Sequence, residues 1–236
     1  MQLFYNSSIT KTATQITFDK TESRHIVRVL RKKEGDILHI TNGKGFLFTT
    51  EISVANDKKC IATILKSIEK PKYWNYYLHI AIAPTKSNDR FEWFLEKATE
   101  IGIDEITPII CKNSERRNIK TERMQKIIQS AMKQSLKFTL PKLNDPIKFS
   151  SFIYQNFDGK LLIAHCEDSD KNLLKNEVKN TTKITILIGP EGDFSLDEIT
   201  KAIENNFSPI SLGESRLRTE TAGITAVHTV SLVNND

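Results

Sequence analysis

The spacing of hydrophobic residues changes about a third of the way along the chain. Before residue 70, apolar and polar residues alternate in short runs such as Phe46–Val54, which is typical of strands with one buried face. From residue 77 onward, short β-branched runs alternate with stretches in which apolar residues recur every three or four positions. This alternation predicts an α/β fold with a mostly parallel sheet, preceded by a small β-rich, barrel-like domain.

We place the domain boundary near Pro71, so that the domains span residues 1–71 and 72–236. In the first domain we expect strands at 15–18, 37–41, 46–54 and 60–68, and a short helix at 21–31. In the second we expect strands at 77–83, 106–110, 161–164, 184–188 and 209–212, and helices at 91–101, 122–136, 196–205 and 219–233. The helical spacing predicts buried side chains, among them Phe94, Ile199 and Ile203.

Residues 184–195 read as a strand, a glycine-rich loop and the start of a helix. The apolar strand stops at Gly189-Pro190, which the interior of a strand does not tolerate, and Gly192 follows shortly after. Ser195 then opens a helix, with Glu198 three residues on as its capping-box partner. The loop therefore lies at the carboxyl end of a buried strand.

The next unit repeats this arrangement, because the strand at 209–212 ends at Gly213 and a polar loop leads to the final helix. Ligands of open α/β sheets bind in the crevice beyond the carboxyl ends of the strands, where glycines let a ligand approach the backbone. Glycines can equally serve only to turn the chain. Two such loops favour a binding site because they also carry charged residues, namely Glu191, Arg216, Arg218 and Glu220.

The chain has 236 residues and a net charge of +5, and the charge is unevenly distributed. Residues 1–70 hold 12 Lys and Arg against 7 Asp and Glu, and residues 112–148 hold 10 against 3. Two basic segments in an otherwise acidic chain favour a polyanionic partner. Solvated charge on amphipathic helices is the alternative explanation.

Composition also disfavours several other classes of protein. The 3 cysteines and 5 histidines form neither a disulfide framework nor a metal-ligand pattern, so we expect reduced thiols and no metal. No apolar run reaches the length of a membrane helix, and the N-terminus lacks the basic and apolar regions of a signal peptide. We therefore expect a cytoplasmic protein that does not bind a membrane.

Two motifs carry a resemblance to a known family. The stretch Ile188-Gly189-Pro190-Glu191-Gly192 with Phe194-Ser195, followed by Leu217-Arg218-Thr219-Glu220-Thr221-Ala222, resembles the RsmE family of the SPOUT superfamily. The run Lys97–Gly102 ahead of a strand is similar to the family as well. Both motifs are long and lie in the order and spacing that the family shows.

The resemblance implies a SPOUT-type methyltransferase domain with a deep trefoil knot, and an N-terminal PUA-like domain that binds RNA. It implies that S-adenosylmethionine donates a methyl group to N3 of one uridine in the 16S ribosomal RNA of the small subunit. It also implies a homodimer. The final helix, whose apolar residues include Leu232 and Val230, is our candidate for the dimer interface.

The candidate catalytic residues are Arg218 and Glu220. We expect Arg218 to stabilise the uracil oxygens or a phosphate, and Glu220 to orient Arg218 or to accept the N3 proton. A structural ion pair between the two is the alternative. The candidate cofactor-binding residues are His165, Ile188, Gly189, Glu191, Gly192, Leu212, Gly213, Leu217, Arg218 and Thr219. The candidate RNA-binding residues are Arg28, Arg31, Lys32, Arg90, Arg116 and Arg117.

The chain departs from the family pattern at three places. Asp193 and Leu136 each stand where a glycine is usual, and Glu214-Ser215 replaces a common Pro-Arg. These changes leave the predicted cofactor loops intact and concern the RNA contacts first.

Three other functions fit part of the pattern. The glycine loops could bind the phosphates of a nucleotide, but neither a P-loop nor a G-x-G-x-x-G motif follows a strand. A non-catalytic RNA-binding or ribosome-assembly factor would fit the basic segments but would leave Arg218 and Glu220 unexplained. A SPOUT methyltransferase with another RNA target would fit all of the motifs.

Overall fold

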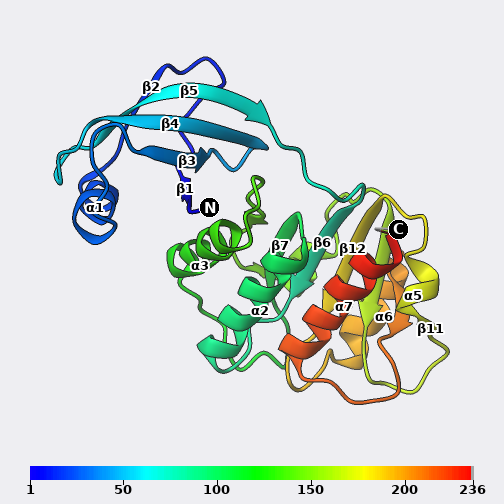
Figure 1. The fold of residues 1–236 in the computed structure, drawn as a ribbon. Helices are drawn as coiled ribbons and strands as arrows, with labels where there is room; N and C mark the ends of the chain where they lie inside the picture. The colour runs from blue at the N-terminus through cyan, green and yellow to red at the C-terminus, as the bar shows by residue number, and fades with distance from the viewer. Residues whose placement is uncertain (235–236) are drawn as a thin grey trace. The chain divides into compact units, whose positions relative to one another are not determined.

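A computed structural model describes residues 1–234 and divides into two compact units (Figure 1). The first unit holds Met1–Tyr73 together with Met132–Leu140, and the second holds Trp74–Ala131 together with the chain from Pro141 onward. The hydrophobic pattern does not indicate that residues 132–140 group with the first unit. The predicted domain boundary at residue 71 stays a prediction.

The first unit is built on a five-stranded sheet with the strand order β1-β3-β4-β5-β2 (Figure 1). Its neighbours pair antiparallel except for β1, which pairs with β3 in parallel. A turn at residues 42–45 joins β3 to β4. It begins with Asn42-Gly43, and the Asn-Gly pair is typical of tight hairpin turns. The strands are β1 (Leu3–Tyr5), β2 (Gln15–Thr17), β3 (Ile37–Thr41), β4 (Phe46–Val54) and β5 (Ile61–Glu69).

The helix of the first unit is shorter than predicted. It consists of α1 (Lys20–Arg24), followed by a π-helical turn, η1 (His25–Val29). The Asp19 side chain caps α1 by accepting from the Glu22 backbone N–H at 2.8 Å. Arg31 has a φ of 54°, which lies in the left-handed region, so the prediction that the helix reaches residue 31 is wrong.

Residues 132–140 bond to the turn between β3 and β4. The Gly45 backbone N–H donates to the Phe138 carbonyl at 2.8 Å, and the Leu140 N–H donates to the Gly43 carbonyl at 2.9 Å. Leu136 has a φ of 53°, in the region that favours glycine. This backbone conformation accounts for the glycine that the family resemblance implies at this position.

The second unit is built on an eight-stranded sheet in the order β11-β13-β10-β12-β6-β7-β8, with β9 also paired to β7. Each of the pairings described for this sheet is parallel, so the predicted parallel α/β architecture is confirmed. The strands are β6 (Tyr77–Ile82), β7 (Glu105–Ile110), β8 (Lys142–Leu143), β9 (Ile147–Lys148), β10 (Lys160–Ala164), β11 (Asn172–Leu173), β12 (Lys183–Ile188) and β13 (Ser208–Ser211).

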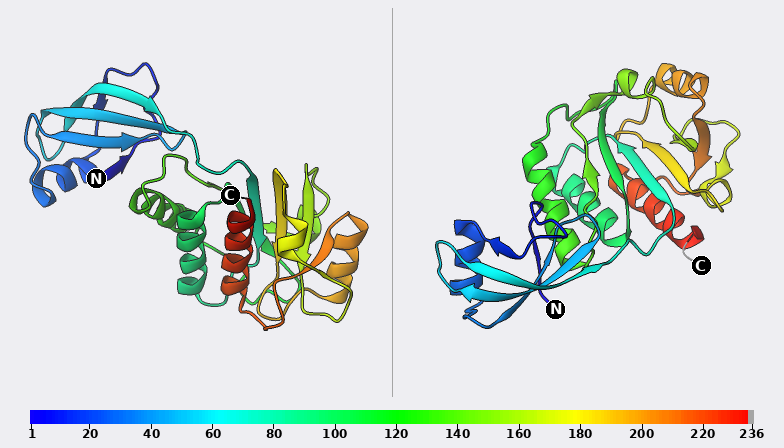
Figure 2. Two further views of the ribbon diagram at one scale, coloured as in Figure 1. Left: turned by 45° about the vertical axis from the view of Figure 1, so that its right-hand side comes forward. Right: turned by 90° about the horizontal axis from the view of Figure 1, so that it is seen from above.

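Helices cover both faces of this sheet (Figures 1 and 2). On one face α7 packs against α2, β6 and β12, and a Cβ atom at Gly223 of α7 would lie only 2.7 Å from the Phe94 ring of α2. On the other face α4 and α6 share a core with the sheet that includes Phe152, Ile199 and Leu187. The helices are α2 (Asn88–Ile101), α3 (Thr121–Gln134), α4 (Phe149–Phe152), α5 (Leu174–Glu177), α6 (Leu196–Glu204) and α7 (Thr219–Asn234).

The predicted long elements of the second unit are confirmed, with ends that move by one to three residues. Two statements about packing are wrong. Ile203 is 47% exposed on α6 rather than buried, and Val230 is buried against this subunit's own core rather than available to a partner. The short elements β8, β9, α4, β11 and α5 were not predicted, because runs of two to four residues carry no measurable hydrophobic period.

Candidate functional site

Because the strands of the second unit's sheet are parallel, their carboxyl ends lie along one edge of that sheet. Strands β12 and β13, which carry the two predicted glycine loops, follow each other in the chain but are not neighbours in the sheet, because β10 lies between them. Ala164 of β10 aligns with Ile188 on one side and with Ile210 on the other. His165, the next residue, therefore lies between the ends of the two glycine loops.

The loop at 189–194, called here the first glycine loop, needs its glycines for its own packing. A Cβ atom at Gly189 would lie 3.1 Å from the Phe194 ring, and one at Gly192 would lie 3.3 Å from the Cβ of Asn113. These distances are tighter than ordinary van der Waals contact. The proposed role of these glycines in meeting a ligand stays a prediction, and the structure adds a packing reason for them.

Asp193 fastens the first glycine loop to the end of β10. Its φ of 61° lies in the left-handed region, which Asp tolerates better than most residues, and this conformation explains why glycine is the usual residue there. Its Oδ2 accepts from the Cys166 N–H at 2.7 Å, and its Oδ1 accepts from the Phe194 N–H at 2.8 Å. Asp193 therefore adds anchoring bonds that a glycine lacks.

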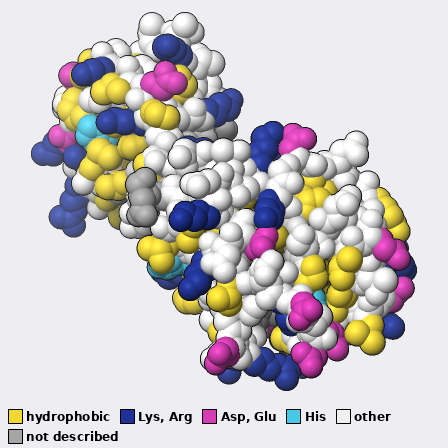
Figure 3. Space-filling model, turned by 90° about the vertical axis from the view of Figure 1, so that its right-hand side faces the viewer, with side chains coloured by type: hydrophobic (Ala, Val, Ile, Leu, Met, Phe, Trp, Pro, Cys, Tyr) yellow, Lys and Arg dark blue, Asp and Glu magenta, His cyan; other side chains and the backbone are white. Residues whose placement is uncertain are grey.

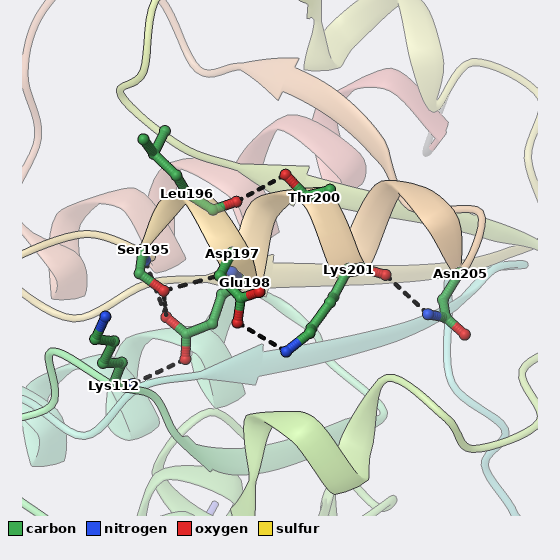
Figure 4. A network of polar contacts seen from close by, with 8 residues as sticks. All are labelled: Lys112, Ser195, Leu196, Asp197, Glu198, Thr200, Lys201 and Asn205. Carbon is green, nitrogen blue, oxygen red and sulfur yellow. Dashed lines mark hydrogen bonds and ion pairs between the residues drawn. The ribbon is translucent and has the colours of Figure 1, made fainter.

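The loop after β7 is tied to the first glycine loop by two side chains. Asn113 Nδ2 donates to the carbonyls of Gly192 (3.0 Å) and Asp193 (3.1 Å). Glu198 closes the predicted capping box with Ser195 and also accepts from the Lys112 backbone N–H at 2.8 Å (Figure 4). Glu198 is 8% exposed, so these bonds form away from water and hold the two loops together firmly.

The loop after β6 is tied in through Glu191 and Arg116. The Lys86 N–H donates to Glu191 Oε1 at 2.8 Å, and Arg116 Nε donates to the carbonyls of Thr85 and Lys86, both at 3.1 Å. Arg117 Nη2 donates to the Lys112 carbonyl at 3.2 Å. The structure thus gives Arg116 and Arg117 bonds within the loops, and their contact with RNA stays a prediction.

His165 lies at this edge with both of its ring nitrogens buried. The side chain is 8% exposed, yet neither ring nitrogen has a hydrogen-bond partner within the part of the chain that the structure describes. Burial, with the nearby Lys171 ammonium, lowers the pKa of the ring, which favours its neutral form. A neutral imidazole with two unpartnered nitrogens offers both a donor and an acceptor to a bound molecule.

Gly213 borders open space. Its φ is 126°, and a Cβ atom there would meet nothing within 4 Å. A ligand can therefore approach the backbone of Gly213 from the direction in which a side chain would point, whereas neighbouring side chains fill this space at Gly189 and Gly192.

The second glycine loop spans residues 212–218, between β13 and α7. A cavity of about 620 Å³ lies where this loop enters α7. Glu220 is only 6% exposed, its Oε1 lies 3.8 Å from Arg90 Nε, and its Oε2 has no partner in the described structure. The ion partner of Glu220 is therefore Arg90, rather than Arg218 as the structural alternative supposed. The cavity is lined by Asp89, Arg90, Trp93, Arg216, Leu217, Arg218, Glu220 and Thr221.

Several of these residues are not evident from sequence. Trp93 lies within an amphipathic helix and reads as one more apolar residue, and Asp193 and Asn113 act through bonds between loops that are distant in the chain. The signal for Trp93 was its position three residues after Arg90, on the same side of α2.

The predicted RNA-binding residues Arg28, Arg31 and Lys32 belong to the first unit, whereas the residues described above belong to the second. Arg28 forms an ion pair with Asp57, whereas Arg31 and Lys32 line an open cavity of about 490 Å³. In the second unit, basic residues of segment 112–148 also pair with acids, as Arg123 does with Glu92 at 2.6 Å. Basic and acidic side chains are interspersed on the face that Figure 3 shows.

Two absences concern the described residues only. None of their helices has the length and apolar character needed to span a membrane. Residues 1–234 also contain no group of three or more His, Cys, Asp or Glu side chains placed to hold a metal ion, and the expectation of no metal stays a prediction.

A second polar cluster lies at the opposite, amino ends of β6 and β7. Asn144 Nδ2 donates to Glu105 Oε1 and to Thr107 Oγ1, both at 2.6 Å, and the Thr107 hydroxyl lies 2.7 Å from His79 Nε2. Because Thr107 accepts from Asn144, its own proton points to His79, whose ring is then a neutral acceptor. Burial lowers the pKa of His79 from 6.5 to about 4.

We expect His79 to make the protein less stable in mild acid. Its folded-state pKa is depressed, so the unfolded chain takes up a proton as the pH falls from 6.5 towards 4 while the folded chain does not. At pH 5 this difference lowers the free energy of unfolding by about 2 kcal/mol relative to pH 7. Urea unfolding at pH 7 and pH 5 measures this effect. Between the two pH values, His79→Gln should lose less free energy of unfolding than wild type does, by that amount. His228→Gln, which changes an exposed histidine, is the matched control, and an equal loss in both variants would contradict this expectation.

Comparison with known proteins agrees with the architecture and the motifs. A family model described as "RNA methyltransferase domain" matches residues 72–231, and one described as "RNA methyltransferase PUA domain" matches residues 18–65. The fold and the matched domains thus define the class: an RNA methyltransferase with an N-terminal PUA domain.

Individual relatives narrow this class. The chain is 32% identical to the ribosomal RNA small subunit methyltransferase E of Buchnera aphidicola subsp. Acyrthosiphon pisum, over 94% of this chain and 90% of that protein. It therefore belongs to the family of ribosomal RNA small subunit methyltransferase E, the RsmE family.

Two solved structures resemble this one over almost their whole length. A "probable rRNA-methyltransferase" from Porphyromonas gingivalis superposes with a TM-score of 0.91 at 40% identity, covering 99% of this chain and 98% of that one. The small subunit methyltransferase E of Neisseria gonorrhoeae, bound to S-adenosyl methionine, has a TM-score of 0.86 at 26% identity, covering 96% and 95%. The trefoil knot stays a prediction.

Proposed function

We propose that this protein transfers a methyl group from S-adenosylmethionine to N3 of one uridine in the 16S ribosomal RNA of the small subunit. The observation that carries the proposal is the pairing of two features beyond the carboxyl ends of the strands: the buried His165 ring, whose nitrogens have no partner among the described residues, and the cavity with the buried Glu220. Membership of the RsmE family supports the choice of methyl donor and of ribosomal RNA. The cytoplasm is the corresponding place of action.

The residues at the strand ends fit the cofactor. The His165 nitrogens, which have no partner among the described residues, can bond the edge of a base, and Gly213 leaves room beside the backbone. Ile188, the last residue of β12, and Leu212, the residue after β13, are our candidates to flank a purine ring. When bound, the cofactor supplies a methyl group on a cationic sulfur that is already reactive. The protein has only to orient it and exclude water.

The chemistry at the acceptor needs more help, because N3 of uracil carries a proton that must leave. We propose that Glu220 accepts that proton, because its Oε2 is buried and has no hydrogen-bond partner among the described residues. Arg218 lines the same cavity and would stabilise the negative charge that develops on the uracil oxygens. Arg90, at 3.8 Å, would hold Glu220 in place.

A second candidate is a non-catalytic RNA-binding factor, which the basic cavity of the first unit favours. One experiment separates the two functions. Purified protein, S-adenosylmethionine with a labelled methyl group, and small subunits from a strain lacking the gene are incubated, and the RNA is digested for mass spectrometry. We expect N3-methyluridine at one position. Cofactor binding without any methylated nucleotide would refute the proposal, and a different methylated base would correct the target.

We further propose that the first unit positions the RNA through phosphate contacts. Arg31 and Lys32 line an open cavity and have the exposure that such contacts need, whereas Arg28 is engaged with Asp57. Replacing Arg31 and Lys32 with Ala should weaken RNA binding. The slope of the logarithm of the binding constant against the logarithm of the salt concentration should fall by the amount expected for the loss of about two phosphate contacts. If this slope does not change, Arg31 and Lys32 do not contact RNA phosphates and are ordinary solvated surface charges.

The enzyme is proposed to act as a homodimer through the outward side of α7. Val227 and Val230 are buried in their own subunit, which leaves Leu232, at 66% exposure, as the apolar residue to test. We expect Leu232→Glu to shift light scattering from the mass of a dimer to that of a monomer without lowering the melting temperature. Leu196→Glu, which changes an exposed leucine of α6, is the control, and a monomeric wild-type protein would contradict the idea.

A further inference from the structure

Helix α2 exposes one large aromatic side chain. Phe91, Phe94 and Leu95 of this helix are 1% exposed or less, whereas Trp93 is 43% exposed. An indole is costly to leave in water, because burying such a ring is worth several times the burial of a methyl group. The exposed part of the Trp93 ring is therefore available to a ligand.

The surroundings of Trp93 suit one kind of ligand. Trp93 lines the same cavity as Arg216, Arg218 and Glu220, and Arg90 precedes it by three residues on the same side of the helix. The cavity volume, about 620 Å³, is ample for a nucleobase with its ribose. An exposed aromatic ring among guanidinium groups is the arrangement with which proteins hold an unstacked base and its phosphates.

The proposed chemistry also requires such a group. A ring nitrogen that pairs within a helix or lies in a base stack is out of reach, so the target nucleotide has to be turned out before a methyl group can be transferred. Turning it out costs stacking free energy, which a protein recovers by stacking the base on one of its own rings. Arg218 and Glu220 can serve the edge of the base but offer no flat apolar face.

We propose that Trp93 stacks on the base that is methylated and holds it with its N3 edge towards Glu220. The inference rests on the proposed function, and it assigns a substrate-binding role to a residue outside both sequence motifs. The ring contributes to binding and orientation of the RNA.

The test compares Trp93→Ala with Trp93→Phe, because phenylalanine keeps a flat aromatic face. With unmethylated small subunits as substrate, we expect kcat/KM to fall roughly 10- to 100-fold for Ala and to stay within about threefold of wild type for Phe. The affinity for S-adenosylmethionine, measured by calorimetry, and the melting temperature should be unchanged in both. An unchanged rate for Ala, or equal losses for Ala and Phe, would overturn the proposal.

A second measurement does not depend on turnover. The only other tryptophan, Trp74, is 4% exposed, so a change of fluorescence that is present in wild type and absent in Trp93→Ala reports on Trp93. We expect unmethylated small-subunit ribosomal RNA to quench this signal more strongly than bulk transfer RNA does. Quenching with an inactive wild type would refute the proposed function alone, whereas equal quenching by both RNAs would refute the stacking. A Trp93→Ala protein that changes its mass in light scattering would assign the ring to a subunit interface instead.

Discussion

The Glu220→Gln variant should bind S-adenosylmethionine as wild type does but methylate RNA about 100 to 1,000 times more slowly. The amide keeps the size of the carboxylate but cannot accept the N3 proton, and general-base catalysis contributes about this much. Glu220 is 6% exposed, and its Oε2 has no hydrogen-bond partner among the described residues, so the carboxylate is available for this role. Single-turnover rates with saturating cofactor measure the effect directly.

The pH dependence separates this role from a structural one. Because the uracil imide ionises by itself in alkali, the rate of Glu220→Gln should recover as the pH rises, which a distorted site would not do. Glu204→Gln, which changes an exposed carboxylate on α6, is the matched control and should retain full activity. A Glu220→Gln enzyme with wild-type kcat would leave Glu220 as the partner of Arg90 alone.

The second large effect is expected at Gly213. Its φ of 126° strains any other residue, and an added methyl group would point into open space at the proposed cofactor crevice. We expect Gly213→Ala to weaken S-adenosylmethionine binding about 10- to 100-fold, the cost of crowding a fitted surface by one methyl group. Isothermal titration calorimetry on the folded variant measures the affinity.

Gly35 provides a matched control in the same chain. It also has a positive φ, of 85°, and a Cβ atom there would likewise meet nothing within 4 Å, but it lies in the first unit. Both alanine variants should lose about 1–2 kcal/mol of stability from backbone strain. If Gly213→Ala lowers the stability but leaves the cofactor affinity unchanged, the cofactor does not approach this loop from that side.

Several features follow from the order of residues along the chain. The β-branched run before Gly189 forms a buried strand, and Ser195 with Glu198 forms the capping box that the spacing predicts. These features depend on residues that are neighbours in sequence, where backbone geometry and hydrogen bonding are local. The two motifs likewise indicate the RsmE family to which the chain belongs.

Other features are decided only when distant segments meet. The sheet inserts β10 between β12 and β13, which places His165 between the glycine loops, where its buried nitrogens have no partner in residues 1–234. No local pattern contains this information, because parallel strands are joined by long crossover connections and their order in the sheet need not follow their order in the chain. The chain order likewise cannot show that Val230 faces inward while Ile203 faces water, since both lie in apolar helical patterns.

The contacts at the cavity around Glu220 are likewise decided by tertiary structure. The sequence by itself determined that Arg218 and Glu220 lie at the start of the final helix, with an ion pair between them as the structural alternative to a catalytic role. Packing of α7 against α2 instead brings Arg90 to Glu220 and Trp93 to the same cavity. Sequence therefore determined which groups are available near the strand ends. Tertiary structure decided which of them meet, because ion pairs and cavities depend on distances that close packing sets between segments far apart in the chain.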